Sequence, residues 1–168
     1  MAITIERATG SDAKEILEFT KAVGSETNNL SYGKEGVRST VEQEAEYLNT
    51  VGTSEKDLFL IARENGELVG TANYSTFSKP RMAHRGEIGI SVRKSMWGKG
   101  IGTMLMERLL SFAKNAAHSE IVSLEVRSDN DRAKNLYRKF GFRTIGTFNG
   151  FFKIDGEFID FDIMEKQL

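Results

Sequence analysis

Three alternating glycines, Gly98, Gly100 and Gly102, separate a strand-like segment from a helix-like one. Residues 87–93 alternate as in a strand, and residues 101–116 carry an apolar stripe of helical period. Glycine lets the backbone turn tightly and lets a ligand approach it closely. Because the first amides of a helix have no internal partners and the helix dipole is positive there, this segment predicts an anion site suited to phosphate.

The spacing of these glycines differs from that of the two commonest phosphate loops. The nucleoside-triphosphate loop Gly-x-x-x-x-Gly-Lys-Ser/Thr is absent, and the dinucleotide fingerprint Gly-x-Gly-x-x-Gly would need one more residue before its last glycine. Lys99 adds a flexible positive charge to the segment. From the glycines alone, a tight strand-to-helix turn without a ligand stays open as the alternative.

Periodicity and turn signals predict the remaining elements. The expected strands are 2–7, 58–63, 68–74, 87–93, 121–126, 142–148 and 158–164, and the expected helices are 12–23, 40–48, 101–116 and 132–140. Glu64-Asn65-Gly66 and Ile154-Asp155-Gly156 are hairpin turn signals, and Thr40 with Gln43 has the spacing of a capping box. This order predicts an α/β fold with a mixed sheet, in which two strand–helix–strand stretches form crossovers.

Composition narrows the class of protein. The 168 residues contain one proline and no linker-like stretch, which favours a single domain over residues 1–168. There is no cysteine, which excludes disulfides, zinc–thiolate sites and cysteine nucleophiles. The net charge of −1 lacks the basic excess of a dedicated nucleic-acid binder. Without a signal-peptide pattern or an apolar run near the ~20 residues of a membrane helix, we expect a cytoplasmic protein without membrane or nucleic-acid partners.

A second group of residues follows the strand 121–126. It consists of Asn130, Ala133, Leu136, Tyr137, Gly141 and Phe142. Together with Trp97-x-x-Gly100-x-Gly102, this group resembles the two signatures of the Gcn5-related N-acetyltransferase (GNAT) family, Arg/Gln-x-x-Gly-x-Gly/Ala and Asn-x-x-Ala-x-x-Leu-Tyr-x-x-x-Gly-Phe. The resemblance covers roughly residues 58–165, and its pattern is similar to small bacterial members of the ribosomal-protein N-terminal acetyltransferase type. Trp97 departs from the Arg or Gln of the family pattern.

The resemblance implies a GNAT fold, with a mixed, mostly antiparallel sheet, flanking helices and two central parallel strands splayed to bind coenzyme A. It implies an enzyme that transfers acetyl from acetyl-CoA to a primary amine of a protein N-terminus or a small molecule. The amine would attack directly in a ternary complex, without a metal. The alternative is a non-catalytic sensor that binds coenzyme A or a nucleotide, and a homodimer is a further possibility.

The resemblance also assigns the cofactor-binding residues. Those expected at the pyrophosphate are Gly98, Lys99, Gly100, Ile101, Gly102 and Thr103, and those expected to pair with pantetheine or polarise the thioester are Ile90, Ser91 and Val92. Asn130 would hydrogen-bond the pantetheine arm or the nearby backbone. Since Asn is favoured at helix starts, a capping role for Asn130 stays open.

Tyr137 is the expected acid. A phenol with a reference pKa of ~10 is protonated at neutral pH and can protonate the departing thiolate, although a plain core aromatic is the alternative. The acceptor amine must lose a proton, and either Glu87 or Glu125 is the expected base, unless water alone serves. We expect His84 and His118 to be structural or superficial.

The acceptor itself is undetermined. The loops 24–36 and 77–84 are expected to shape its pocket, and the aromatic residues Phe148, Phe151 and Phe152 to contribute to the pocket, the core or a dimer surface. Asp160 and Asp162 alternate with apolar neighbours on the last strand, which predicts two exposed strand carboxylates.

Overall fold

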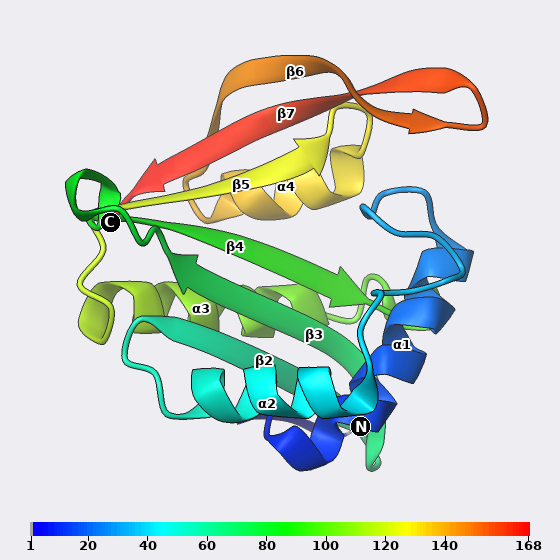
Figure 1. Cartoon of the computed structure of the whole chain (residues 1–168). Helices are drawn as coiled ribbons and strands as arrows, with labels where there is room; N and C mark the ends of the chain where they lie inside the picture. The colour runs from blue at the N-terminus through cyan, green and yellow to red at the C-terminus, as the bar shows by residue number, and fades with distance from the viewer. Residues whose placement is uncertain (1) are drawn as a thin grey trace.

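The computed structural model describes residues 2–168 and contains one seven-stranded sheet with the order β1-β2-β3-β4-β5-β7-β6 (Figure 1). The strands are β1 (Ile3–Arg7), β2 (Asp57–Glu64), β3 (Glu67–Thr76), β4 (Arg85–Val92), β5 (Ile121–Arg127), β6 (Arg143–Ile154) and β7 (Glu157–Gln167). The helices are α1 (Ala13–Glu26), α2 (Val41–Gly52), α3 (Ile101–Asn115) and α4 (Asp131–Lys139), with short 3-10 turns at Gly10–Asp12, Pro80–Met82 and Lys94–Met96. The predicted order of elements and the α/β class are confirmed.

Local sequence signals account for several element boundaries. At the start of α2, Thr40 Oγ1 accepts a hydrogen bond from Gln43 N at 3.1 Å, and Gln43 Oε1 accepts one from Thr40 N at 3.0 Å, which is the predicted capping box. In the hairpin between β2 and β3, Asn65 and Gly66 have φ values of 51° and 88°, the left-handed conformation that a two-residue hairpin turn requires. Gly141 has φ 87° directly after α4 and ends that helix.

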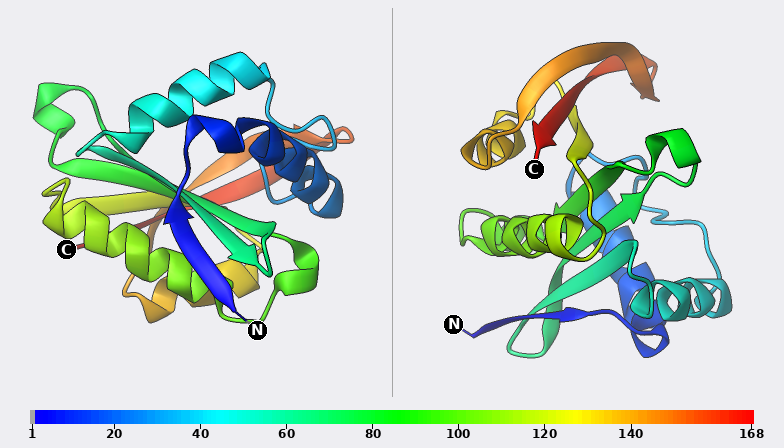
Figure 2. Two further views of the ribbon diagram at one scale, coloured as in Figure 1. Left: turned by 90° about the horizontal axis from the view of Figure 1, so that it is seen from below. Right: turned by 90° about the vertical axis from the view of Figure 1, so that its left-hand side faces the viewer.

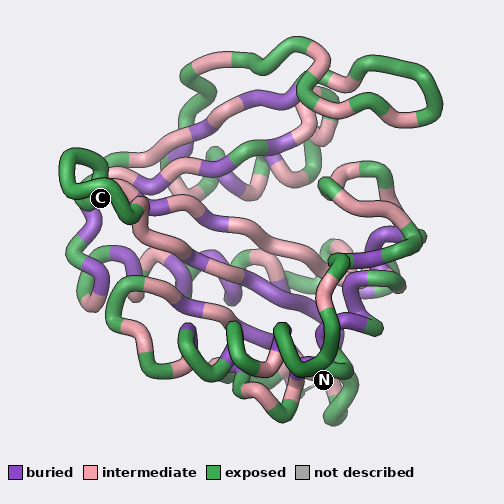
Figure 3. The backbone as a smooth tube through the Cα atoms, viewed as in Figure 1, coloured by how far each residue is buried: buried purple, intermediate pink, exposed green. Residues whose placement is uncertain are grey.

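Helices cover both faces of the sheet. In Figure 2, α3 and α4 lie on one side and α1 and α2 on the other. One core cluster joins the sheet to α3 and includes Ile88, Leu105 and Leu124, and a second joins it to α1 and α2 and includes Ile16 and Leu48. Figure 3 shows this burial along the strands and on the inner sides of the helices. Among residues 2–168, no helix is both long and apolar enough to cross a membrane.

The sheet is interrupted at its centre. The parallel strands β4 and β5 pair only at their starts, where Arg85, Gly86 and Glu87 lie opposite Ile121, Val122 and Ser123. Beyond these positions the two strands diverge, as Figure 1 shows. All other neighbours in the sheet are antiparallel. The structure therefore leaves the β5-facing edge of β4 without a strand partner from Ile88 to Val92, among the residues that it describes.

Some boundaries depend on contacts that lie far apart in the sequence. Helix α1 continues to Glu26 instead of ending at Val23, and the Glu26 carboxylate accepts hydrogen bonds from Arg93 Nε and Lys94 N, both at 2.8 Å. These contacts fix a segment that the sequence predicted as a loop. Strand β6 extends to Ile154, beyond the predicted end at 148, and accommodates register shifts against β7.

The expectation that Asp162 is exposed was wrong. Its residue is only 6% exposed, because Lys134 from α4 reaches over β7 and forms an ion pair with it. Ser128 and Thr147 also donate hydrogen bonds to the Asp162 carboxylate, at 2.7 and 2.9 Å. Asp160 is exposed as predicted and accepts a hydrogen bond from Gly150 N at 2.8 Å.

Candidate active site

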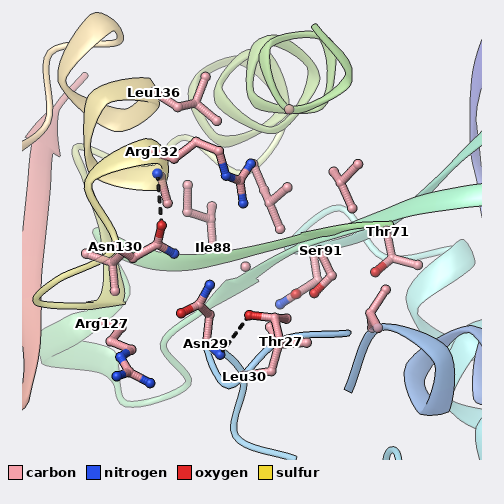
Figure 4. A pocket seen from close by; sticks show the side chains of 18 of the residues that line it. Thr27, Asn29, Leu30, Thr71, Ile88, Ser91, Arg127, Asn130, Arg132 and Leu136 are labelled. Atoms are coloured by element: carbon pink, nitrogen blue, oxygen red, sulfur yellow. Dashed lines mark hydrogen bonds between the residues drawn. The ribbon is translucent and has the colours of Figure 1, made fainter. Parts of the chain in front are cut away.

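A cleft of about 760 Å³ occupies the opening between β4 and β5. The first turns of α3 and α4 border one part of it, and the segment between α1 and α2 borders another. Figure 4 shows residues from both sides, with Asn130 and Arg132 projecting from the start of α4 and Thr27 and Asn29 from the segment after α1. The divergence of the two parallel strands thus creates a cavity at the centre of the fold.

The glycine segment forms one wall of this cleft. Gly98 and Gly100 have φ values of 76° and 83°, and a Cβ built at either position would meet no atom within 4 Å. Both therefore leave free space where a ligand could approach the backbone. Gly100 stands at the start of α3, where Met104 N donates to Gly100 O at 3.1 Å as the first helical bond. The amides before Met104 are free for an anion, and this geometry fits a pyrophosphate.

Gly102 has a different reason to be glycine. A Cβ at this position would lie 3.0 Å from Leu136 Cδ2, so the absence of a side chain lets α3 pack closely against α4. Gly98, Gly100, Ile101, Gly102 and Thr103 all line the cleft. Lys99 does not, and its Nζ lies 3.4 Å from Met96 Sδ instead.

The free edge of β4 forms the floor of the cleft. Ile90, Ser91 and Val92 line it, at positions where β5 has already diverged. On the other edge of β4, these residues pair with β3, and the side chain of Asn73 lies so close to Gly89 that a Cβ there would be 2.8 Å from its Oδ1. An extended ligand could therefore pair with the unoccupied backbone edge as an added strand would.

Asn130 caps helix α4 at the cleft. Its Oδ1 accepts a hydrogen bond from Ala133 N at 3.2 Å, which satisfies one of the free amides of the first turn. The amide Nδ2 takes no part in this bond, and Asn130 lines the cleft. The two expectations for Asn130, a cap and a ligand contact, are therefore geometrically compatible because they use different atoms.

Tyr137 lies two turns further along α4 and is 9% exposed. It packs against Phe142, with ring centroids 6.1 Å apart, and it also lines the cleft. Burial raises the pKa of the Tyr137 phenol to about 12, against a smaller lowering by the positive charge of Arg132. Its hydroxyl makes no hydrogen bond to another residue in the described part of the chain. The phenol thus stays protonated and available as a proton donor.

Glu87 and Glu125 both line the cleft but differ in exposure. Glu87 is half-buried on β4, whereas Glu125 is exposed on β5. Burial raises the pKa of Glu87, and the charge of Glu125 raises it further. Ser123 lies opposite Glu87 in the short paired region, and Glu125 follows two residues later on the same face of β5. The structure therefore brings the two carboxylates to the same part of the cleft.

Several cleft residues were not expected from the sequence. They include Asn73, Trp97, Arg132 and Phe161. The segment 24–36 contributes as predicted, and so does Phe152. Trp97 belongs to the first motif and Arg132 to the second, and their side chains are in contact. The periodicity of a single helix or strand could not have indicated this contact.

The loop 77–84, which we expected to shape the acceptor pocket, does not line this cleft. This loop leads into the first residue of β4, at the end where β4 and β5 are paired, whereas the cleft opens at the other end of these strands. His84 contributes its carbonyl to Glu120 N and Ile121 N there, and neither His84 nor His118 lines the cleft.

A splayed parallel strand pair beside a glycine-lined helix start is an α/β arrangement that could hold an extended, phosphate-bearing ligand. A sequence model of the acetyltransferase (GNAT) family matches residues 25–142, more than half of the chain, and the chain belongs to this family. The match begins earlier than the motifs indicated and includes the segment between α1 and α2.

Individual relatives agree with this assignment. The chain is 37% identical to the N-alpha-acetyltransferase RimI of Mycobacterium tuberculosis over 95 residues, which are 56% of this chain and 58% of that protein. It is 29% identical to the L-amino acid N-acetyltransferase AaaT of Escherichia coli over 101 residues, which are 60% of this chain and 62% of that protein. The chain thus spans about 60% of the length of these curated relatives.

Solved structures share the fold over nearly the whole chain. An acetyltransferase of the GNAT family from Streptococcus pneumoniae superposes with a TM-score of 0.95 at 30% identity and covers 99% of this chain and 100% of that one. A structure from Salmonella typhimurium with its cofactor acetyl-CoA has a TM-score of 0.86 at 21% identity, with 100% of this chain and 95% of that one covered. The predicted GNAT fold is confirmed.

Proposed function

We propose that this protein is an N-acetyltransferase that uses acetyl-CoA and a primary amine. One observation carries the proposal. Within residues 2–168, a protonated phenol without a hydrogen-bond partner and a glycine-lined helix start line one cleft, and a strand edge without a partner strand lies between them. These are the parts needed to hold a long phosphate-bearing thioester and to protonate its leaving group. The names of the two curated relatives, both N-acetyltransferases, support the same reaction.

Each part of the cleft has a separate task in this proposal. The amides of Gly98 to Thr103 bind the pyrophosphate, and the free edge of β4 at Ile90 to Val92 orients the pantetheine arm by backbone pairing. Acetyl-CoA, when bound, supplies the reactive thioester. A backbone amide of β4 directed at the thioester carbonyl would stabilise the negative charge that develops on its oxygen.

Two side-chain groups move protons. Glu87 accepts a proton from the acceptor ammonium, directly or through water, and the neutral amine then forms the new N–C bond as the C–S bond breaks. Tyr137 Oη donates its proton to the departing sulfur. The second proton of the attacking nitrogen, released as the amide forms, passes directly or through water to the tyrosinate and restores the phenol. We assign the base to Glu87, because burial raises its pKa above the ordinary carboxyl value and toward neutrality, where a general base is most effective.

The acceptor end of the cleft suits a primary amine of a protein N-terminus or of a small molecule. Glu87 and Glu125 give it negative charge, which favours a cationic amine. The segment after α1 and Phe152 of the hairpin β6–β7 also line the cleft. The names of the two relatives cover both kinds of acceptor, N-alpha groups and L-amino acids.

The test is a screen of amine acceptors, monitored by release of free thiol from acetyl-CoA. Wild-type protein should release thiol with at least one peptide N-terminus or small amine. Tyr137→Phe should retain the affinity for acetyl-CoA and lose more than tenfold in turnover at neutral pH, which is the size of effect typical of an acid catalyst. Tyr47→Phe is the matched control, because Tyr47 is exposed on α2 and does not line the cleft.

Calorimetry separates this proposal from two others. Binding of acetyl-CoA without thiol release from any amine would identify a sensor module instead of an enzyme. Preferential binding of NAD would contradict the cofactor assignment. Equal turnover of Tyr137→Phe and wild type would remove Tyr137 from the mechanism.

A further inference from the structure

An arginine and a tryptophan from the two sequence motifs stack on each other, and both line the cleft. The Arg132 guanidinium lies 3.6 Å from the centre of the Trp97 ring, close enough for a strong cation–π contact. The ring is fixed in turn, because Trp97 Nε1 donates a hydrogen bond to Val92 O at 2.9 Å. Figure 4 shows Arg132 reaching from the start of α4 toward the side of the cleft formed by α3.

Arg132 has no anionic partner in the described part of the chain. Arg63, Arg85, Arg93 and Arg127 each form an ion pair, whereas no carboxylate or hydrogen-bond acceptor contacts Arg132. Its residue is exposed, yet partial burial of the guanidinium lowers its pKa. A guanidinium that is held in place without a counter-ion can bind an anionic ligand without first breaking an ion pair.

The position of this cation identifies the anion. The guanidinium packs on Trp97, which directly precedes Gly98, and both Arg132 and the glycines at the start of α3 line the same cleft. Lys99, the expected cation of the segment, points to Met96 Sδ. Lys94 is further from the indole, at 5.9 Å, and does not line the cleft.

We propose that Arg132, supported by the face of Trp97, binds the pyrophosphate of acetyl-CoA together with the amides of the glycine segment. The inference rests on the proposed function and adds a residue to its cofactor site. The family pattern has Arg or Gln at the position of Trp97. In this chain the aromatic ring at that position carries no charge itself. It supports the positively charged guanidinium of Arg132, which comes from helix α4. The planar guanidinium can bond two phosphate oxygens at once, which a flexible lysine cannot do as well.

The experiment measures the equilibrium affinity for acetyl-CoA by calorimetry, without an acceptor. Arg132→Gln should weaken binding by about tenfold or more, the size expected for a lost charge-assisted phosphate contact. Arg138→Gln is the matched control, since Arg138 lies on the same helix, is exposed, does not line the cleft and donates a hydrogen bond to Asn135. Arg132→Gln should also reduce the salt dependence of the affinity, because one fewer ionic contact is screened.

Trp97 is tested by a double-mutant cycle. Trp97→Ala should weaken acetyl-CoA binding several-fold in the wild-type background and much less in the Arg132→Gln background, because the ring acts through the arginine. Equal losses in both backgrounds would overturn the role of Trp97 as a support. Thermal unfolding of each variant checks that the loss is not a loss of fold.

The affinities for acetyl-CoA and for acetyl-dephospho-CoA, which lacks the 3′-phosphate, show which phosphate Arg132 contacts. Equal loss of affinity for both ligands in Arg132→Gln supports the pyrophosphate. A loss confined to acetyl-CoA would overturn the proposal in favour of the 3′-phosphate, and no loss with either ligand would overturn it altogether. If wild-type protein binds neither ligand, the proposed function fails as well, so the two failures are distinguishable.

Discussion

Lys134 in α4 and Asp162 in β7 form a buried ion pair, with side chains 11% and 8% exposed. Lys134 Nζ also donates to Ser128 O at 3.1 Å, at the end of β5. The pair therefore ties three elements together at the base of the helix that carries Tyr137. A partnered, hydrogen-bonded carboxylate can remain charged inside a fold, whereas an unpartnered one cannot.

We predict that Asp162→Asn destabilises the protein by about 3 kcal/mol at pH 7, because it leaves the Lys134 charge buried without a partner. Burial alone would raise the pKa of Asp162, but hydrogen bonds from Lys134, Ser128 and Thr147 outweigh this and lower it. The carboxylate thus contributes stability above its unfolded pKa of about 3.9, and this contribution is lost as the pH falls through the lower folded value.

Urea unfolding at pH 7 and near pH 3 measures this effect. The difference between wild type and Asp162→Asn should shrink at the lower pH. Asp160→Asn serves as the control, since Asp160 is exposed on the same strand, and should cost less than about 1 kcal/mol. A pH-independent difference would show that the charge of Asp162 is not what stabilises the fold.

A comparison of alanine variants at Gly100 and Gly66 separates the effect of backbone strain on stability from an effect on ligand binding. Their φ values are 83° and 88°, and a Cβ at either would meet no atom within 4 Å. Replacement of either by Ala should therefore cost a similar amount of stability, about 1–2 kcal/mol, from the left-handed conformation alone. Only Gly100→Ala should weaken acetyl-CoA binding, by tenfold or more, because its methyl group enters the space proposed for the pyrophosphate. Calorimetry and thermal unfolding of both variants check this, and equal affinities would contradict the glycine cradle.

The sequence predicts best those features that depend on neighbours in the chain. The capping box of Thr40 and Gln43 and the Asn65-Gly66 turn each need only a few adjacent residues, and the structure has both. The fold class was predicted by the order of these elements together with the two family motifs.

Side-chain contacts between residues far apart in the sequence were not predicted, because no local pattern indicates them. Strand alternation assigned Asp162 to solvent because it could not indicate that Lys134, 28 residues earlier, covers that face. Similarly, Trp97 was noted only as a departure from the family pattern, since its partner Arg132 belongs to the other motif. Lys99 looked like the natural phosphate cation, but its side-chain direction depends on the position of Met96 in the folded loop.

Asn130 should contribute to stability and to cofactor binding through different atoms. Asn130→Ala removes the cap of α4 and should cost about 1 kcal/mol, as should Thr40→Ala at the start of α2. Asn130→Asp keeps an oxygen that can cap the helix but loses the Nδ2 donor. We therefore expect Asn130→Asp to be nearly as stable as wild type and to bind acetyl-CoA several-fold more weakly. Thr40→Ala should leave binding unchanged, and wild-type affinity in Asn130→Asp would restrict Asn130 to its capping role.

The charge of Glu125 should control the titration of Glu87. Burial is the larger cause of the raised pKa of Glu87, and the negative charge of Glu125 is the second. Glu125→Gln removes a like charge, which makes ionised Glu87 less unfavourable, so its pKa should fall but stay above the ordinary value of 4.5. Carboxyl-resolved NMR titration of the free protein measures this without an acceptor. Glu120→Gln is the control, because Glu120 is exposed just before β5 and does not line the cleft.

The same pair of variants distinguishes the two possible bases once an acceptor is found. If Glu87 is the base, its ionised form is required, and kcat/KM falls at acidic pH as Glu87 becomes protonated. Glu125→Gln should then move this fall to lower pH and leave the rate at neutral pH within about threefold. Glu87→Gln should lose more than tenfold at neutral pH, where Glu87 is ionised, and this loss should shrink at acidic pH. The opposite result, a large loss in Glu125→Gln with an active Glu87→Gln, would assign the base to Glu125, and small losses in both would leave proton removal to water.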